Sequence, residues 1–226
     1  MNPGYRIIKN FERPLKETVE KFRTVPVTTI SDAMNRTASV NSTIRPVNHV
    51  RLTGTAYTVR CQAGDNLMLY YAIDNALPGD VIVLDGAGYT ERAVTGELII
   101  KSAKNRGIAG FVIDGVVRDW EEISQMSDFA VFCKGTNPNG SYKNGPGEIN
   151  VPVVIGGRVI RPGDIIAGDI NGLVVVPRED AETVLQRTEA IAAKEERTMK
   201  LLDNGGTLDV SWMYRKLEAE GCEIIE

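Results

Sequence analysis

The hydrophobic residues of this chain switch between the spacing of strands and the spacing of helices with one apolar face. Residues 54–61 alternate as in a half-buried strand, and residues 81–84 form the continuous apolar run of a strand buried on both faces. A helix is expected between them, over 66–75. A helix over 96–106 and a strand over 109–114 then repeat the order. This strand-helix-strand pattern predicts an α/β fold with parallel strands at its centre.

The second half of the chain is dominated by short apolar runs joined by glycine turns. Further strands are expected over 129–133, 151–155, 158–160, 164–167 and 172–176. Residues 135–147 are rich in Gly, Asn and Pro and are expected to form a long loop, which in a compact domain commonly carries function. The pattern predicts a mixed sheet core with helices, and no linker interrupts it. We therefore expect a single domain over residues 1–226.

Two short patterns in the chain carry turn and capping signals. Pro78-Gly79-Asp80 has the residue order of a type II turn, and Pro162-Gly163-Asp164 repeats it. Near the N-terminus, a helix is expected over 17–22. Residues 27–34 resemble the start of a second helix, with Thr29 or Ser31 accepting a free backbone N–H.

A long C-terminal helix is expected over about 179–202, with acidic residues at its start that suit the helix dipole. At 100° per residue, Glu195 falls inside an apolar stripe that includes Val184, Ile191 and Met199. A carboxylate on an apolar face needs a partner. Either Glu195 forms a salt bridge at a subunit contact, or the helix delivers Glu195 to the active site of a neighbouring subunit.

The composition excludes several classes of protein. Hydrophobic residues make up 42% of the chain and charged residues 25%, as in a protein that folds around its own core. The net charge of -4 and the absence of a Lys/Arg run argue against nucleic acid as a partner. No apolar run approaches the roughly 20 residues that span a bilayer, and the first residues lack the apolar core of a signal peptide. We expect a cytoplasmic protein with no membrane partner.

Cysteine and histidine offer little catalytic chemistry. Cys61, Cys133 and Cys222 are odd in number and far apart, which favours free thiols over a disulfide framework or a zinc site. The only histidine, His49, lies in a segment of connecting character. Ser-His-Asp and Cys-His catalysis therefore lack their usual base unless His49 supplies it.

The strongest candidate site combines Gly96-Glu97-Leu98-Ile99 with Arg118 and Asp119. The free N–H groups of a helix that starts near Gly96 can bind a carboxylate, and a glycine there lets the ligand approach the backbone. Arg118 can hold a keto or enolate oxygen, and Asp119 is a hard oxygen ligand suited to Mg²⁺ or Mn²⁺. Alternatively, Arg118 and Asp119 cap a helix and pair only with solvent.

Lys134 and residues 86–91 raise two other chemistries for this region. Lys134 follows a predicted strand and raises the possibility of a Schiff-base aldolase, but it borders a polar loop with nothing nearby to favour the neutral amine. The segment Gly86-Ala87-Gly88-Tyr89-Thr90-Glu91 has two glycines of a dinucleotide fingerprint but Glu91 in the third place. A nucleotide cofactor is therefore not expected.

Several motifs stand in the order found in one family. They are Gly64-Asp65-Asn66-Leu67, Pro78-Gly79-Asp80-Val81, Gly96-Glu97-Leu98, Gly107-Ile108-Ala109-Gly110, Asp114-Gly115-Val116-Val117-Arg118-Asp119 and Gly145-Pro146-Gly147-Glu148-Ile149-Asn150. As a set, from roughly Thr24 to Glu196, the chain resembles the RraA-like family. That family contains the class II 4-hydroxy-4-methyl-2-oxoglutarate/4-carboxy-4-hydroxy-2-oxoadipate aldolases and the RraA regulators of ribonuclease E. The resemblance implies a swivelling β/β/α sandwich that assembles as a homotrimer or homohexamer, with sites at subunit interfaces and the C-terminal helix at such an interface.

The resemblance also implies a role for each candidate residue. The backbone of Gly96, Glu97, Leu98 and Ile99 would cradle the pyruvyl carboxylate. Arg118 would bind the keto oxygen, and Asp119 would be the direct ligand of Mg²⁺ or Mn²⁺. Glu97 stands where some aldolases have an aspartate that orients a metal-bound water. Glu195 resembles the acid that the C-terminal helix offers to the metal waters of a neighbouring subunit.

Two hypotheses about function follow from these residues and this resemblance. The first is a metal-dependent lyase that acts on short 2-keto acids through a pyruvate enolate. Its reaction would be retro-aldol cleavage of 4-hydroxy-4-methyl-2-oxoglutarate-type substrates, oxaloacetate decarboxylation, or both. The second is a non-catalytic regulator that binds a ribonuclease or another protein partner. Joint retention of the Gly96 cradle, Arg118 and Asp119 favours the lyase, because a binding protein does not need all three together, although one protein could do both.

Overall fold

The computed structural model of the protein describes residues 2–225. The chain divides into two compact units, with the boundary between Thr188 and Glu189. All strands of the described residues belong to the first unit. The expected C-terminal helix is present as α6 (Ala181–Asp203), and a further helix that the sequence did not reveal, α7 (Ser211–Ala219), follows it.

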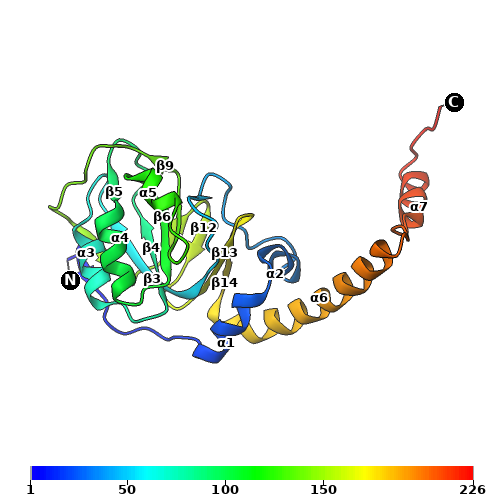
Figure 1. The fold of residues 1–226 in the computed structure, drawn as a ribbon, viewed down its shortest axis with the longest axis horizontal. Coiled ribbons are helices and arrows are strands. Elements are labelled where there is room, and N and C mark those ends of the chain that lie inside the picture. The colour runs from blue at the N-terminus through cyan, green and yellow to red at the C-terminus, as the bar shows by residue number, and fades with distance from the viewer. Residues whose placement is uncertain (1, 226) are drawn as a thin grey trace. The chain divides into compact units, whose positions relative to one another are not determined.

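The central feature of the first unit is a mixed sheet that contains nine of the described strands (Figure 1). Its members are β1 (Arg6–Ile7), β2 (Arg45–Pro46), β3 (Leu52–Cys61), β4 (Asp80–Asp85), β6 (Gly110–Asp114), β8 (Ala130–Cys133), β10 (Gly147–Ile149), β13 (Ile165–Asp169) and β14 (Gly172–Val176). Strands β3, β4, β6 and β8 are parallel neighbours, as predicted. Strands β10 and β13 pair with β3 antiparallel, and β2 pairs with β8 antiparallel. This arrangement confirms the mixed sheet.

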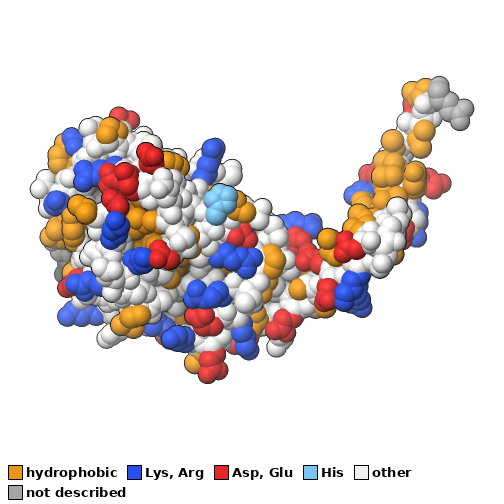
Figure 2. Space-filling view, in the orientation of Figure 1, with side chains coloured by type: hydrophobic (Ala, Val, Ile, Leu, Met, Phe, Trp, Pro, Cys, Tyr) orange, Lys and Arg blue, Asp and Glu red, His pale blue; other side chains and the backbone are white. Residues whose placement is uncertain are grey.

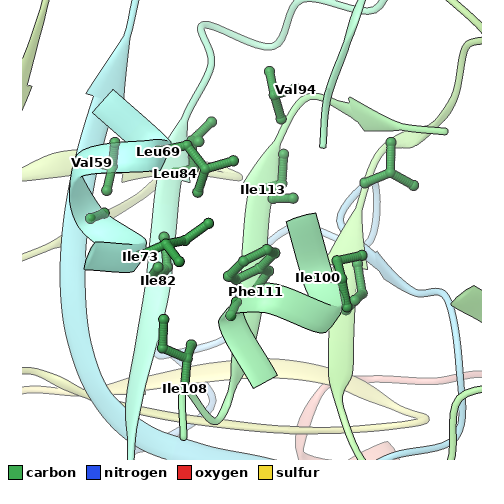
Figure 3. Packing of buried hydrophobic residues seen from close by; sticks show 14 of the residues in the cluster. Val59, Leu69, Ile73, Ile82, Leu84, Val94, Ile100, Ile108, Phe111 and Ile113 are labelled. Atoms are coloured by element: carbon green, nitrogen blue, oxygen red, sulfur yellow. The ribbon is translucent and has the colours of Figure 1, made fainter. Parts of the chain in front are cut away.

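Helices α3 (Leu67–Asn75), α4 (Glu97–Asn105) and α5 (Trp120–Ser124) connect the parallel strands. Ile82, Leu84 and Phe111 pack against apolar residues of these helices, such as Ile73 and Ile100, in one core cluster (Figure 3). Successive side chains of a strand point to opposite faces of the sheet. The intervening residues of β4 therefore belong to a second cluster on the other face, and the continuous apolar run over 81–84 reflects burial on both sides.

That second cluster is closed by the hairpin of β11 (Val153–Ile155) and β12 (Arg158–Ile160). A three-stranded parallel sheet, β5 (Ala93–Thr95), β7 (Val116–Val117) and β9 (Gly135–Thr136), continues from the chain segments that leave β4, β6 and β8. Because the carboxyl ends of parallel strands are where open α/β sheets place ligands, this small sheet marks the edge on which to look for a site.

The two Pro-Gly-Asp turns have the same geometry. Gly79 and Gly163 have φ values of +90° and +91°, which glycine adopts without strain. In each turn the aspartate N–H donates to the carbonyl three residues back, at 3.0 Å for Asp80 and 3.1 Å for Asp164. The aspartate Oδ2 also accepts an N–H from that same residue at 2.8 Å in both turns. The type II turn predicted at Pro78-Gly79 is thus confirmed, and its repeat shares the side-chain bond.

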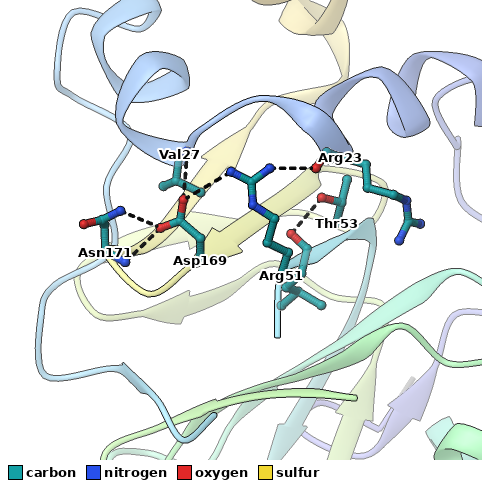
Figure 4. Close-up of polar contacts among 7 residues, drawn as sticks. Arg23, Val27, Arg51, Thr53, Asp169 and Asn171 are labelled. Carbon is teal, nitrogen blue, oxygen red and sulfur yellow. Dashed lines mark hydrogen bonds and ion pairs between the residues drawn. The ribbon is translucent and has the colours of Figure 1, made fainter. Parts of the chain in front are cut away.

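The start of helix α2 (Val27–Ala33) differs from the prediction. Thr29 and Ser31 lie inside the helix, so the expectation that one of them caps it is wrong. Pro26 precedes the helix, and the carboxylate of Asp169 accepts the N–H of Val27 at 3.2 Å (Figure 4). The cap therefore comes from the end of β13, a partner that local sequence does not reveal.

Other boundaries shift by a few residues. Near the N-terminus, α1 (Lys16–Lys21) is followed by a 3₁₀ turn over Phe22–Thr24. Another 3₁₀ turn, Arg178–Asp180, precedes α6. The strand predicted to begin at 151 begins at Val153, because Pro152 has no N–H to donate to a ladder. The predicted loop over 135–147 contains β9 at its start. No helix within residues 2–225 combines the length and apolar character needed to cross a bilayer.

Candidate active site

The candidate site begins at Gly96, the residue between β5 and α4. Its φ of −158° is extended backbone that any residue adopts, so conformation does not explain the glycine. Lack of space explains the glycine, because a Cβ at this position would lie 2.4 Å from Oδ2 of Asp119 and 2.9 Å from Cγ of Arg118. The absent side chain is what allows the start of α4 to approach both residues.

Asp119 connects the starts of two helices. It precedes α5 in the left-handed conformation, with φ 58° and ψ 46°, which aspartate tolerates better than most side chains do. Its Oδ2 accepts the N–H of Glu97 at 3.0 Å and lies 3.9 Å from Nε of Arg118. Left-handed backbone at a residue other than glycine is more common at functional sites than elsewhere, so this conformation supports a functional role for Asp119.

Arg118 is held by its backbone, and its guanidinium is half-exposed with Oδ2 of Asp119 at 3.9 Å from Nε. Its N–H donates to the carbonyl of Thr95 at 3.0 Å, which continues the pairing of β7 with β5. The side chain is half-exposed. Together with Gly96 and Ile99 it lines a cavity of about 90 Å³, a space that suits a small ligand. The other charged side chain that lines this cavity is Lys143, which is also cationic. The wall thus favours an anion.

The remaining predicted residues differ in how closely they approach this cavity. The carboxylate of Glu97 pairs with Nζ of Lys101 at 2.6 Å, one helical turn away. Leu98 is exposed, whereas Ile99 lines the cavity. The N–H of Glu97 is occupied by Asp119, and helix geometry leaves the N–H groups of Leu98 and Ile99 without intrahelical acceptors. Glu195 belongs to the second compact unit, and the site described here is built from the first alone.

The residues of the other chemistries lie apart from this cavity. Lys134 pairs with Oδ1 of Asp114 at 2.7 Å, and an ion-paired ammonium is not the neutral amine that a Schiff base requires. His49, the one pale blue side chain in Figure 2, is exposed and does not line the cavity. The cysteines are free, and burial raises the pKa of Cys61 and of Cys133 to about 12. Both thiols are therefore protonated at neutral pH and inert as nucleophiles.

Asp119 is the side chain at this site that could bind a metal directly. Within residues 2–225 no cluster of three or more His, Cys, Asp or Glu side chains could hold a metal ion. Zinc, which takes three or four protein ligands, does not fit that donor set. Mg²⁺ fits it, because this ion commonly keeps several waters and is held by one or two carboxylates.

Sequence reasoning missed part of the cavity wall. Asn66 and Thr95 line it and are almost fully buried, yet Oδ1 of Asn66 and Oγ1 of Thr95 have no hydrogen-bond partner in the described chain. Lys143 comes from the loop after β9. The available signals were the Asp65-Asn66 pair before an apolar helix and the length of the loop, but neither indicates which cavity the residues line.

The protein is of the α/β class, with a small cavity lined by two cationic side chains at the edge where parallel strands end, which is where open α/β sheets place ligands. Comparison with known proteins defines the family. Residues 27–175 match the model of the RraA-like family, described as Aldolase/RraA, and the chain belongs to that family.

The similar proteins include one that is named as an aldolase and two that are titled as RraA inhibitors or members of that inhibitor family. The chain is 44% identical over 188 residues, 82% of its length and 89% of the relative's, to a protein of Halalkalibacterium halodurans named "Putative 4-hydroxy-4-methyl-2-oxoglutarate aldolase". It superposes with a TM-score of 0.75 on Streptomyces coelicolor RraAS2, titled an unusual member of the RNase ES inhibitor RraA protein family. That match has 27% identity and covers 84% of this chain and 99% of the other. The RNA-processing inhibitor RraA of Thermus thermophilis gives a TM-score of 0.62 at 27% identity, over 67% of this chain and 92% of that one.

Proposed function

We propose that the protein is a divalent-metal-dependent carbon–carbon lyase that acts on short 2-keto acids through a pyruvate enolate. The observation that carries this proposal is the close approach of Gly96 to Arg118 and Asp119, which joins the open backbone and fixed cation of the cavity wall to a hard carboxylate beside it. The aldolase name of the relative at 44% identity supports the same reaction class.

The protein residues would bind and orient the pyruvyl part of the substrate. The N–H groups of Leu98 and Ile99 would hold its carboxylate, as helix N-termini commonly do. The guanidinium of Arg118 would donate to the keto oxygen. As the carbon–carbon bond breaks, negative charge moves onto that oxygen, and a donor already in place then stabilises the enolate more than the ground state.

Mg²⁺ or Mn²⁺ would be held directly by Asp119. Glu97 and Glu195 would contact it only through waters. Bound there, the ion would act as a Lewis acid that polarises the keto group. In the structure Asp119 accepts the backbone N–H of Glu97, whereas the Glu97 carboxylate pairs with Lys101 and would have to leave that partner to reach a metal-bound water.

We further propose that Glu195 acts across a subunit interface of a homotrimer or homohexamer. A mixing experiment tests this arrangement. Glu195→Gln and Arg118→Ala proteins would each be nearly inactive alone, and co-refolded mixtures would regain activity because some sites then receive an intact residue from each subunit. Mixtures that stay as inactive as the parents would show that Glu195 does not act in trans.

A second candidate function is a non-catalytic regulator that binds a ribonuclease or another protein partner. The observation that favours it is the superposition on two solved structures that are titled as RraA inhibitors. Such a protein would not need Arg118, so the Arg118→Ala variant would bind its partner unchanged.

Kinetics of Arg118 variants separate the two candidates. Pyruvate release from oxaloacetate and from 4-hydroxy-4-methyl-2-oxoglutarate would be measured with Mg²⁺, with enzyme-free samples subtracted because oxaloacetate also loses carbon dioxide unaided. Arg118→Ala should lower kcat by about 10² to 10³, the cost of one oxyanion donor. Arg118→Lys keeps the positive charge but loses the planar guanidinium, so its kcat should lie between those of the unmodified protein and Arg118→Ala. Unchanged turnover in Arg118→Ala would remove Arg118 from the mechanism.

A further inference from the structure

We propose that Arg92 is a positioning residue, which fixes one wall of the cavity beside Gly96 so that the guanidinium of Arg118 faces the ligand. This role rests on the proposed function, since it takes that cavity as a site for a small anion. Arg92 does not line the cavity and would act only through the residues that it holds.

The wall next to Arg118 is formed by the loop that follows β9. Gly140 and Ser141 of this loop line the cavity together with Arg118. A Cβ at Gly140 would lie 3.2 Å from Nη1 of Arg118, which is tighter than an ordinary van der Waals contact. The backbone of Gly140 therefore lies close to the guanidinium, and a shift of this backbone would change where the guanidinium can lie.

Arg92 holds the loop through two contacts of its guanidinium. Nη1 of Arg92 donates to the carbonyl of Gly140 at 2.9 Å, and Cζ lies 4.1 Å from the ring centroid of Tyr142. The side-chain stem is held as well, because a Cβ at Gly64 would lie 3.2 Å from Cδ of Arg92. Within residues 2–225 Arg92 makes no ion pair with a carboxylate, so the loop is the partner of its guanidinium.

Two backbone bonds tie the loop to the core just before and just after the residues that line the cavity. The N–H of Ala93 donates to the carbonyl of Asn139 at 2.8 Å, and the N–H of Tyr142 donates to the carbonyl of Gly64 at 2.8 Å. The stretch between these ties is two residues long, and Arg92 holds its first carbonyl. Arg92 therefore sets the position of the stretch that lies beside the guanidinium.

Without Arg92, the Gly140 carbonyl would lose its donor while a second guanidinium lies beside it. A partly buried carbonyl that is left unpaired costs free energy, so it takes a new donor where one is within reach. Arg118 has five N–H donors and is half-exposed, so its guanidinium can turn toward that carbonyl. A guanidinium that turns to the wall is lost to the ligand. Arg92 thus keeps Arg118 available for an anion that Arg92 itself does not touch.

A double-mutant cycle on anion binding tests this role without turnover. The probe is oxalate, a planar dianion of about the size of pyruvate that cannot form an enolate. The full chain is titrated by calorimetry at a fixed Mg²⁺ concentration, with protein-free titrations subtracted. Arg92→Ala should weaken oxalate binding by about 10-fold, the scale of one hydrogen bond to a charged group. Arg92→Lys can keep the bond to the carbonyl and the ring contact, so it should weaken binding less.

The decisive comparison is made in the Arg118→Ala background, with oxalate raised to concentrations that measure its weaker binding there. In that background Arg92→Ala should weaken binding by less than about 2-fold, because the guanidinium that Arg92 positions is already absent. A merely structural role of Arg92 would give the same loss in both backgrounds, and so would direct attraction of the anion by its charge. Equal losses would therefore overturn the proposal.

Asn139→Ala is the matched control, because Nδ2 of Asn139 ties the same loop to the carbonyl of Glu91 at 3.2 Å, at an exposed position outside the cavity. It should bind oxalate as the unmodified protein does. An equal loss in Asn139→Ala would also contradict the proposal, as would oxalate binding that is unchanged in Arg92→Ala or absent from the unmodified protein. Coupling between Arg92 and Arg118 without pyruvate release would keep the role of Arg92 and remove the lyase, whereas release without coupling would do the reverse.

Discussion

At the scale of single residues, Gly96 is the position on which the site depends most. Arg118 and Asp119 occupy the space that a side chain at this position would fill. We predict that Gly96→Ala lowers pyruvate release by about 10²-fold, the cost of displacing reacting groups by about 1 Å. The free energy of unfolding should change by less than about 1 kcal/mol, because Asp119 can swing away and alanine tolerates the extended φ.

Gly115→Ala is the control for that change, since a Cβ there meets its neighbours at 3.5 Å, an ordinary contact. It should keep most of the activity. Equal losses in the two variants would mean that the space at Gly96 is not what the site requires.

Two buried thiols give a prediction about pH at the same scale. Burial raises the pKa of Cys61 and Cys133 from 9.0 to about 12, so the folded state holds these protons where the unfolded chain has lost them. Their contribution to stability is therefore full below pH 9 and falls as the pH rises from 9 toward 12. At pH 10 each thiol should lower the free energy of unfolding by about 1.4 kcal/mol relative to pH 8.

Urea titrations at pH 8 and pH 10 measure this dependence. Cys61→Ala and Cys133→Ala should each reduce the drop between the two pH values, whereas Cys222→Ala, at an exposed position, should leave it unchanged. A drop that is the same in all three variants would assign it to other groups.

At the scale of elements, the start of α2 shows how one strand end stabilises a distant helix. Besides capping Val27, Asp169 accepts the N–H of Asn171 at 2.8 Å and lies 4.0 Å from Nη2 of Arg51 (Figure 4). We predict that Asp169→Ala costs about 1 to 2 kcal/mol in urea unfolding, as expected for loss of a buried cap.

The ion pair in this cluster should matter less than the cap. Arg51 is half-exposed and its contact is long, so Arg51→Ala should cost about 1 kcal/mol or less. If Arg51→Ala proved the more damaging change, charge rather than capping would be what holds α2.

The same scale shows where sequence reasoning succeeds and where it fails. Strand β3 was predictable from the alternation over 54–61 and β4 from the continuous apolar run over 81–84, although β3 is buried on both faces rather than half-buried. Strands β2, β7 and β9 have two residues each and pair with strands that are distant in sequence. Two residues are too few to show the alternation of apolar and polar positions that predicts a strand.

Some residues of the candidate site could likewise be predicted from the sequence, and others could not. Motif order made Gly96, Arg118 and Asp119 the candidates, and the structure brings these three residues together. The positions of Asn66 and Lys143 on one cavity wall depend on bonds to Asp65 that only the folded chain forms. The bond between Asp119 and the Glu97 N–H is of the same kind, since it depends on the approach that Gly96 permits.

At the scale of the whole molecule, the second compact unit contributes little burial of its own. Helix α7 contains no buried residue, and its large apolar side chains, such as Trp212 and Tyr214, are exposed. We predict that a chain ending at Asp203 unfolds with a free energy within about 0.5 kcal/mol of the full chain, as for changes at exposed positions. A larger loss in urea unfolding would show that residues 204–226 support the fold.

Pyruvate release as a function of metal, in the unmodified protein and in Asp119→Asn, decides whether the protein is a metal-dependent lyase centred on Asp119. We expect release that depends on Mg²⁺ or Mn²⁺, stops with chelator, returns when metal is restored, and is weak in Asp119→Asn at saturating metal. Release that is unaffected by chelator and unchanged in Asp119→Asn would contradict a metal-dependent lyase centred on Asp119.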